Sequence, residues 1–339
     1  MPQVADFSYD VNADWERLPA GLQHRDVSAV DVDSQDRVYL LTRYDSNVLV
    51  YEPDGSFITA WGGEVFTNPH GLTVGPDDSV YCVDNGDHSV RKFSADGKLL
   101  LTFGRPGEPS DTGHRHGVSF IVHNVETVQR PGPPFNGCTN LAVAPDGRLY
   151  VADGYGNCRV HVFSADGQLL NSWGEVGIGP GQFHLPHGIA LAPDGRVHVC
   201  DRENDRIQIF DPDGRYLTQW TDVQRPCQIA IDRDGFGYVA ELWRPKGKGS
   251  FTRGFMTEDR PGRVTIFDRD GSIVARWGAS TINRAAPGCF IAPHGIAVDS
   301  RGDIYVSEVT YTFGIKANGL GEDHASHQLQ KFSRKGTGR

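Results

Sequence analysis

Short runs of alternating apolar and polar residues, each bounded by a turn signal, extend along almost the whole chain. The segment 186–220 is representative, because it holds four such runs with Asp-Gly pairs and one polar turn between them. Runs of about 5–6 residues separated by Asp-Gly pairs are typical of antiparallel strands joined by tight hairpins. We therefore expect this segment to form one four-stranded antiparallel sheet.

The same pattern recurs in phase along the chain. Six copies occupy about residues 25–62, 69–104, 137–174, 186–220, 226–278 and 293–332. Such a repeat predicts an all-β fold, a six-bladed β-propeller of four-stranded blades that forms a single domain over residues 1–339. A β-sandwich or two separate domains are the less favoured alternatives.

The sixth copy lacks its last strand. The N-terminal segment from Phe7 to Trp15 has a suitable length to supply it, and a blade completed in this way would close the ring without exposed sheet edges. The insertions between and within copies, at 105–136, 243–262, 279–291 and 312–326, are expected in loops that surround a binding mouth.

Composition and charge narrow the possible partners. The net charge of −10 argues against nucleic acid and against anionic membrane surfaces, since both favour basic patches. The N-terminus shows no secretory signal, and no apolar stretch approaches the roughly 18 residues of a membrane helix, so we expect a cytoplasmic protein. Its six cysteines should then mostly be thiols; whether Cys138 and Cys158 pair stays open.

When the copies are aligned, histidine occupies alternate copies at the start of the first strand. The residues at this position are Ser28, His70, Thr139, His187, Cys227 and His294. Each histidine lies in a Pro-His-Gly triplet. In a six-fold ring, alternate positions form a triangle about the axis, and the first strand of a blade is the innermost, so these imidazoles can converge in the channel.

Three neutral imidazoles with an open coordination position are typical of a catalytic zinc site. We therefore predict one zinc ion per chain, bound by His70, His187 and His294. The alternative is that Pro-His-Gly only marks the entry to a strand. That alternative is the better one for any single histidine, but not for three in a symmetric triangle.

Two further aligned positions lie at and after the end of the second strand. The first holds carboxylates in five copies, which we interpret as structural hydrogen-bonding groups of the blade turns: Asp84, Asp153, Asp201, Glu241 and Glu308. The next position holds Arg43 and Arg202, which the repeat does not require and which suit a carboxylate or a developing oxyanion. In the third copy, Tyr155 follows Gly154 at this point and places a hydroxyl at the same mouth.

These motifs carry a family resemblance. The repeats resemble NHL repeats, and the segments around Pro69, Ala152 and Gln182–Phe210 resemble the peptidyl-α-hydroxyglycine α-amidating lyases, a family of six-bladed propellers with zinc bound by three histidines. The resemblance covers the chain from about Arg43 to His294 and implies His70, His187 and His294 as zinc ligands. It implies Tyr155 as the catalytic base, flanked by Arg43 and Arg202.

The resemblance has one departure at the metal site. The family has an acidic residue that helps to bind calcium directly after the third histidine, whereas this chain has Gly295, which argues against calcium.

The function expected from these residues is a zinc-dependent lyase that cleaves the N–C bond of a carbinolamide, such as an α-hydroxyglycine derivative, to an amide and an aldehyde. Zinc would acidify the substrate hydroxyl, and Tyr155 would accept its proton. The partner is a small-molecule substrate, anionic if the two arginines bind it. The alternatives are a zinc hydrolase or hydratase of a small ester or lactone, and a non-catalytic NHL interaction platform.

Overall fold

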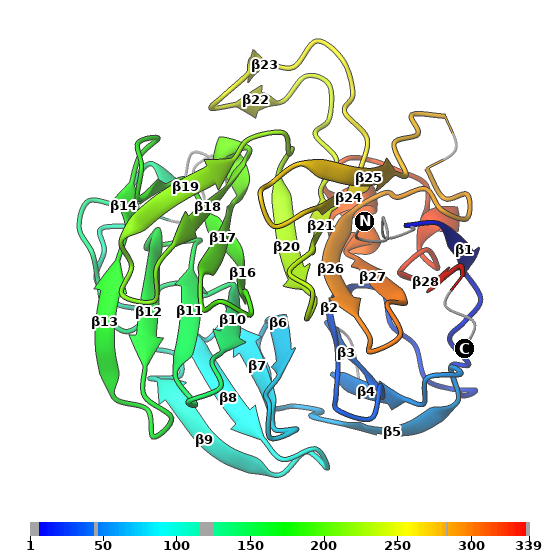
Figure 1. Ribbon diagram of the computed structural model, residues 1–339, viewed down its shortest axis with the longest axis horizontal. Coiled ribbons are helices and arrows are strands. Elements are labelled where there is room, and N and C mark those ends of the chain that lie inside the picture. Colours follow the sequence, from blue (N-terminus) through cyan, green and yellow to red (C-terminus); the bar gives the residue numbers. More distant parts are fainter. Residues whose placement is uncertain (1–6, 44–46, 116–124, 283, 337–339) are drawn as a thin grey trace, which may run out of the picture.

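The chain folds into six four-stranded antiparallel sheets arranged radially around a central axis, a β-propeller (Figure 1). The computed structural model describes residues 7–43, 47–115, 125–282 and 284–336. Within these residues no helix is long and apolar enough to cross a membrane.

Each blade uses its strands in sequence order from the axis outward, apart from the last blade. Blade 1 consists of β2 (Val27–Val32), β3 (Val38–Thr42), β4 (Val48–Tyr51) and β5 (Phe57–Trp61). Blade 2 consists of β6 (Pro69–Val74), β7 (Val80–Asp84), β8 (Ser89–Phe93) and β9 (Leu99–Gly104). Blade 3 consists of β10 (Asn140–Val143), β11 (Leu149–Asp153), β12 (Arg159–Phe163) and β13 (Leu169–Trp173).

The second half repeats this plan. Blade 4 consists of β16 (Pro186–Leu191), β17 (Val197–Asp201), β18 (Arg206–Phe210) and β19 (Tyr216–Trp220). Blade 5 consists of β20 (Pro226–Ile231), β21 (Gly237–Glu241), β24 (Arg263–Phe267) and β25 (Ile273–Trp277). Blade 6 consists of β26 (Pro293–Val298), β27 (Ile304–Glu308), β28 (Leu329–Arg334) and β1 (Tyr9–Asn12).

The N-terminal strand closes the ring, as predicted. Strand β1 pairs antiparallel with β28, with Tyr9 opposite Arg334 and Asn12 opposite Lys331. The innermost strands contact one another in the circular order β2, β6, β10, β16, β20 and β26, and β26 contacts β2 again. Each inner strand therefore has a neighbour on both sides, and the ring has no gap.

Aromatic rings link each blade to the next. A ring near the end of one blade's outermost strand packs against an aromatic ring of the following blade, with centroids 5.0–5.8 Å apart. The pairs are Trp61–Phe93, Phe103–Phe163, Trp173–Phe210, Trp220–Phe267, Trp277–Phe332 and Trp15–Tyr51. Trp15, from the N-terminal segment, provides the sixth link. Burial of these rings is a major apolar contribution to each interface between blades.

The insertions carry small elements of their own. The hairpin of β22 (Gly249–Ser250) and β23 (Gly254–Phe255) projects from blade 5, and β14 (Glu175–Val176) pairs with β15 (Gln182–Phe183) before blade 4. Short helical segments follow β17 (η1, Arg202–Asn204) and β27 (η2, Thr310–Lys316; η3, Glu322–His324). The regular blades therefore bear irregular segments of different chemistry.

Candidate metal centre

Three histidines from alternate blades meet at the axis. His70, His187 and His294 are the second residues of the inner strands β6, β16 and β26, and all three are buried. Their ligand nitrogens lie within 4.8 Å of one another, and their ring centroids are 4.7–4.9 Å apart. The structure therefore brings together the three side chains that the aligned repeats predict to converge, and this cluster could hold a metal ion.

The orientation of each imidazole is fixed by the next blade. His70 Nδ1 lies 2.8 Å from the carbonyl oxygen of Thr139, His187 Nδ1 lies 2.7 Å from that of Cys227, and His294 Nδ1 lies 2.7 Å from that of Ser28. A carbonyl oxygen only accepts hydrogen bonds, so Nδ1 carries the proton in each ring and Nε2 presents its lone pair. Such a backbone contact at the second nitrogen is the usual companion of a metal-binding histidine.

The glycines of the first two Pro-His-Gly triplets leave room for this contact. A Cβ atom at Gly71 would lie 2.5 Å from the Thr139 oxygen, and one at Gly188 would lie 2.6 Å from the Cys227 oxygen. These are the carbonyl groups that accept the histidine protons. At Gly295 a Cβ atom would lie 2.4 Å from Ser307 Oγ, so an acidic side chain of the kind associated with calcium would not fit there without a shift.

Burial and neighbouring cations keep the three imidazoles neutral. Burial lowers the pKa of His294 to about 3, and the charges of Arg43 and Arg202 act in the same direction. The pKa values of His70 and His187 also lie well below the ordinary value, chiefly because of burial. Neutral imidazole is the form that binds a metal ion, so three buried neutral donors on one side with an open fourth position fit a catalytic zinc-like ion.

Tyr155 reaches the open side of this triangle. Its hydroxyl oxygen lies 3.0 Å from His70 Nε2 and 3.4 Å from His187 Nε2. Glycines on both sides allow this placement, since a Cβ atom at Gly154 would lie 2.1 Å from the Pro186 oxygen and one at Gly156 would lie 2.5 Å from Asn136 Oδ1. The turn after β11 therefore presents the phenol to the histidines.

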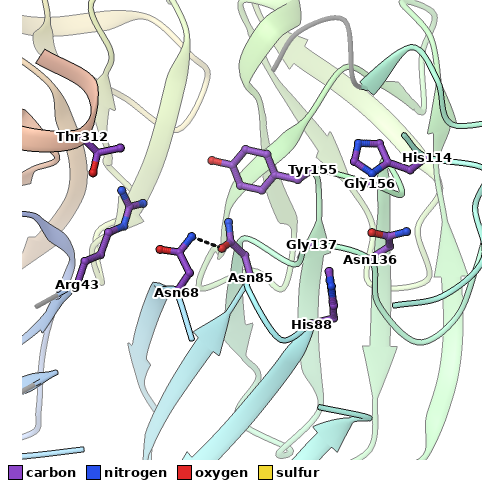
Figure 2. A pocket seen from close by; sticks show the side chains of 10 residues that line it. All are labelled: Arg43, Asn68, Asn85, His88, His114, Asn136, Gly137, Tyr155, Gly156 and Thr312. Carbon is purple, nitrogen blue, oxygen red and sulfur yellow. Dashed lines mark hydrogen bonds between the residues drawn. The ribbon is translucent and has the colours of Figure 1, made fainter. Parts of the chain in front are cut away.

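Arg202 lies against Tyr155 on the blade 4 side. Its Nη1 atom is 3.4 Å from the Tyr155 hydroxyl, and its guanidinium carbon is 5.6 Å from the centre of the phenol ring. Arg43 lines the same cavity as Tyr155, together with Asn68, Asn85 and Thr312, and that cavity has a volume of about 340 Å³ (Figure 2). The structure therefore places Arg43 in the wall of the cavity, whereas Arg202 is buried and reaches the site through Tyr155.

Glu203 is a buried residue beside this site that the sequence analysis did not single out. Its Oε1 atom accepts hydrogen bonds from Arg202 Nε at 2.9 Å and from Arg225 Nη2 at 2.7 Å, and its Oε2 atom lies 3.5 Å from Arg244. Burial would raise the pKa of the Glu203 carboxyl, but the three arginines outweigh burial and hold the pKa well below its usual value. Glu203 therefore fixes the guanidinium of Arg202 from behind.

Asp205 extends this network to the β22–β23 hairpin. Its carboxylate accepts hydrogen bonds from Arg244 at 2.7 Å and from Thr252 at 2.7 Å. Arg225 and Arg244 belong to blade 5 and its insertion, where neither the repeat nor residue spacing indicated a role.

The aligned carboxylates have the structural role that we expected. Asp84 accepts backbone N–H bonds from Thr67 and Asn68, Asp201 accepts one from His184, and Glu308 accepts those of Ile291 and Ala292. Each carboxylate thereby ties the end of the second strand to the loop that enters the first. The six cysteines are free thiols, so Cys138 and Cys158 do not pair.

The comparisons with known proteins agree with this architecture. A sequence profile of the NHL repeat matches residues 66–93, 135–163 and 183–210. NHL repeat-containing protein 3 of Mus musculus is 32% identical over 289 residues, which cover 80% of this chain and 73% of that protein. The chain belongs to the NHL-repeat protein family.

Amidating enzymes are similar to this chain to a comparable degree. Peptidyl-glycine alpha-amidating monooxygenase A of Xenopus laevis is 34% identical over 84% of this chain, which spans 29% of that enzyme. Peptidyl-alpha-hydroxyglycine alpha-amidating lyase 1 of Drosophila melanogaster is 28% identical over 78% of the chain and 47% of its own length. These relatives support the suspected family resemblance.

Solved structures support the fold. A virginiamycin B lyase from Staphylococcus aureus superposes on 96% of this protein and 100% of its own chain, with a TM-score of 0.58 and 14% identity. At this identity the similarity shows the fold alone.

Proposed function

We propose that the protein is a metal-dependent lyase that splits the C–N bond of a carbinolamide into an amide and an aldehyde. The observation that carries the proposal is the contact of the Tyr155 hydroxyl with His70 Nε2 at 3.0 Å, because it places an ionisable hydroxyl directly against the nitrogens that would bind the metal. Relatives named as amidating lyases give independent support for this reaction class.

The ion would be held by His70, His187 and His294. Zinc is the best candidate, because three imidazole donors are typical of catalytic zinc sites. When bound, such an ion would supply Lewis acidity that lowers the pKa of a substrate hydroxyl. Side chains of the protein itself would carry out the proton transfers and stabilise the developing charge.

Tyr155, as phenolate, would accept the proton of the substrate hydroxyl. Arg202 donates toward the Tyr155 oxygen and would stabilise the negative charge on it. The electrons of the broken O–H bond would form the C=O bond of the aldehyde while the C–N bond breaks. Tyr155 would then return the proton to the departing amide nitrogen, so that no water is consumed.

Oxygen labelling tests the reaction class. The purified protein is incubated with α-hydroxyhippurate in water enriched in oxygen-18, and the earliest products are analysed by mass spectrometry. We expect benzamide and glyoxylate, with no label in the amide oxygen. Benzoate labelled in its carboxylate would indicate acyl hydrolysis by the same site, and the lyase proposal would then be wrong.

Bound metal tests the other alternative. An interaction platform without catalytic function should contain no stoichiometric transition metal, whereas the proposed enzyme should contain about one ion per chain. Elemental analysis of the protein purified without added metal distinguishes the two.

A further inference from the structure

One buried carboxylate, that of Asp205, joins the end of the η1 turn to blade 5 and its insertion. Its Oδ1 atom accepts hydrogen bonds from the backbone N–H of Arg225 at 2.8 Å and from Arg244 Nη2 at 2.7 Å. Its Oδ2 atom accepts them from Thr252 Oγ1 at 2.7 Å and from Arg253 Nε at 3.0 Å. These four donors all come from blade 5 and its insertion, whereas Asp205 directly follows the second strand and η1 of blade 4.

The η1 turn has little restraint of its own. It is a single turn of three residues, and its closing hydrogen bond, from Asp205 N–H to the Arg202 carbonyl oxygen, is long at 3.4 Å. Asp205 also adopts a left-handed backbone conformation, with a φ of 52°. Such a conformation is unfavourable for a residue with a Cβ atom and persists where surrounding contacts stabilise it. The four bonds to the Asp205 carboxylate are contacts of this kind.

Arg244, at the base of the insertion, contacts both acidic residues of this turn. Its Nη2 atom donates to Asp205, and its Nη1 atom lies 3.5 Å from Glu203 Oε2. Its backbone exchanges two hydrogen bonds, of 2.8 and 2.9 Å, with Arg260 on the returning side of the insertion. Glu203 in turn accepts a hydrogen bond from Arg202 Nε at 2.9 Å. A displacement of the insertion would therefore reach the Arg202 guanidinium through buried charged groups.

The tip of the β22–β23 hairpin makes a second contact with blade 4. The Phe251 ring stacks on the His184 imidazole, with centroids 4.1 Å apart and planes inclined by 27°. His184 lies just before β16, and its carbonyl oxygen accepts a hydrogen bond from Glu203 N–H at 3.0 Å. Its Nδ1 atom lies 3.0 Å from Asn204 Oδ1. The hairpin thus contacts η1 through Asp205 and also contacts the loop to which η1 is bonded.

We propose that residues 251–253 of this hairpin position Arg202 against Tyr155, so that an insertion outside the six blades is part of the reactive site (Figure 1). This inference rests on the proposed lyase function, in which Arg202 stabilises negative charge on the Tyr155 oxygen. The distance from Arg202 Nη1 to that oxygen is 3.4 Å, close to the limit for a hydrogen bond. A small outward shift of the guanidinium would therefore break the contact.

The double variant T252V/R253M tests the link at its exposed end. It removes both donors to Asp205 Oδ2 at similar side-chain volume, and both residues are exposed, so the blades should fold normally. We expect kcat to fall about tenfold, because misplacement of a group near the reacting atoms is costly even when its cause is remote. KM should change by less than about twofold, because other residues line the cavity beside Tyr155.

Three further variants separate positioning from general damage. T252S/R253K keeps a hydroxyl and a cation and should restore kcat to within about twofold of the wild type. F251A removes the stack on His184 and should lower kcat by about threefold. F255A removes a ring on the same hairpin that is 72% exposed, and it should leave kcat unchanged.

Hydrogen exchange measures the same link without turnover. The N–H groups of Arg202 and Glu203 bond to the carbonyl oxygens of Leu185 and His184, so their exchange reports the opening of η1. Mass spectrometry should show about tenfold faster exchange in segment 202–206 of T252V/R253M than in the wild type, because loss of contacts favours local opening. Segment 216–220, the outer strand of the same blade, should exchange at the wild-type rate, as should both segments in F255A.

The inference requires both faster exchange of segment 202–206 and lower kcat in T252V/R253M, and the absence of either overturns it. Loss of bound metal in that variant, or an equal loss of kcat in F255A, would also overturn it, since either would indicate general damage. If the wild type cleaves no carbinolamide, the lyase function itself is wrong. The exchange rates would then decide by themselves whether the hairpin holds the turn that bears Arg202.

Discussion

Blades 2, 4 and 6 carry a histidine at the start of the inner strand, and blades 1, 3 and 5 do not. The two sets of blades use this same position of the inner strand in different ways. Blades 2, 4 and 6 turn an imidazole toward the axis and donate its Nδ1 proton to the next blade. Blades 1, 3 and 5 supply the accepting carbonyl groups, and the hydroxyl groups of Ser28 and Thr139 donate onward to the carbonyl oxygens of Pro69 and Pro186 in the following blade. The residues that could bind metal are thus also links between blades, so binding and ring structure are coupled.

The largest expected effect comes from removal of an imidazole from blade 2, 4 or 6. H70A, H187A or H294A should reduce bound metal from about one ion per chain to near zero, because two imidazoles leave the coordination incomplete. Elemental analysis after gel filtration measures this loss. H324A, in the η3 turn, is the control and should keep the metal. Full metal content in the triple histidine variant would contradict the site.

The next largest expected effect is the loss of turnover when the hydroxyl of Tyr155, in blade 3, is removed. Y155F should retain metal and fold but lower kcat by about a hundredfold or more, the usual range for a general acid–base group. Steady-state kinetics together with metal analysis of the same sample check this. Y216F, on the outer strand β19, is the matched control. Near-normal turnover by Y155F would exclude this tyrosine from the reaction.

The depressed histidine pKa values predict how the metal-free protein responds to acid. The unfolded chain takes up protons near pH 6.5, whereas folded His294 does so only near its pKa of about 3. Between these values the unfolded state binds more protons, so stability should fall as pH decreases, by about 1.4 kcal/mol per pH unit for each such histidine. Urea unfolding of chelator-treated protein at pH 6, 5.5 and 5 measures this slope.

The variant H294Q should reduce that slope by about one proton equivalent, or roughly 1.4 kcal/mol per pH unit. H324Q should leave it unchanged. A slope that is the same in H294Q and in the wild type would show that this imidazole is not buried in the neutral form.

The smallest expected effect concerns the hydroxyl links of blades 1 and 3. T139V removes the donor to the Pro186 and Ala152 carbonyl oxygens, each 3.0 Å away, while the side-chain volume stays similar. We expect a loss of about 1 kcal/mol in the free energy of unfolding, the usual contribution of one hydrogen bond. T218V, exposed on β19, should change stability little, and an equal loss in both variants would argue against this link.

The repeat pattern was sufficient to predict much of the site as well as the fold. Alignment of the copies placed His70, His187 and His294 at one position, and a six-fold ring converts that position into a triangle. The same alignment places Asn68 and Asn85 at the positions of Asp26 and Arg43, but the hydrogen bond between their two side chains is visible only in the structure.

The sequence by itself therefore determined the number of blades, the closure by the N-terminal strand and the residues that face the axis, since each follows from periodicity. Only the tertiary structure decided the Nδ1 proton of each histidine, because the accepting carbonyl belongs to a different blade. It also decided the cluster of Glu203 with Arg225 and Arg244, which no repeat position predicts. Those contacts join segments of different blades, and their geometry depends on the packing of irregular loops rather than on local sequence.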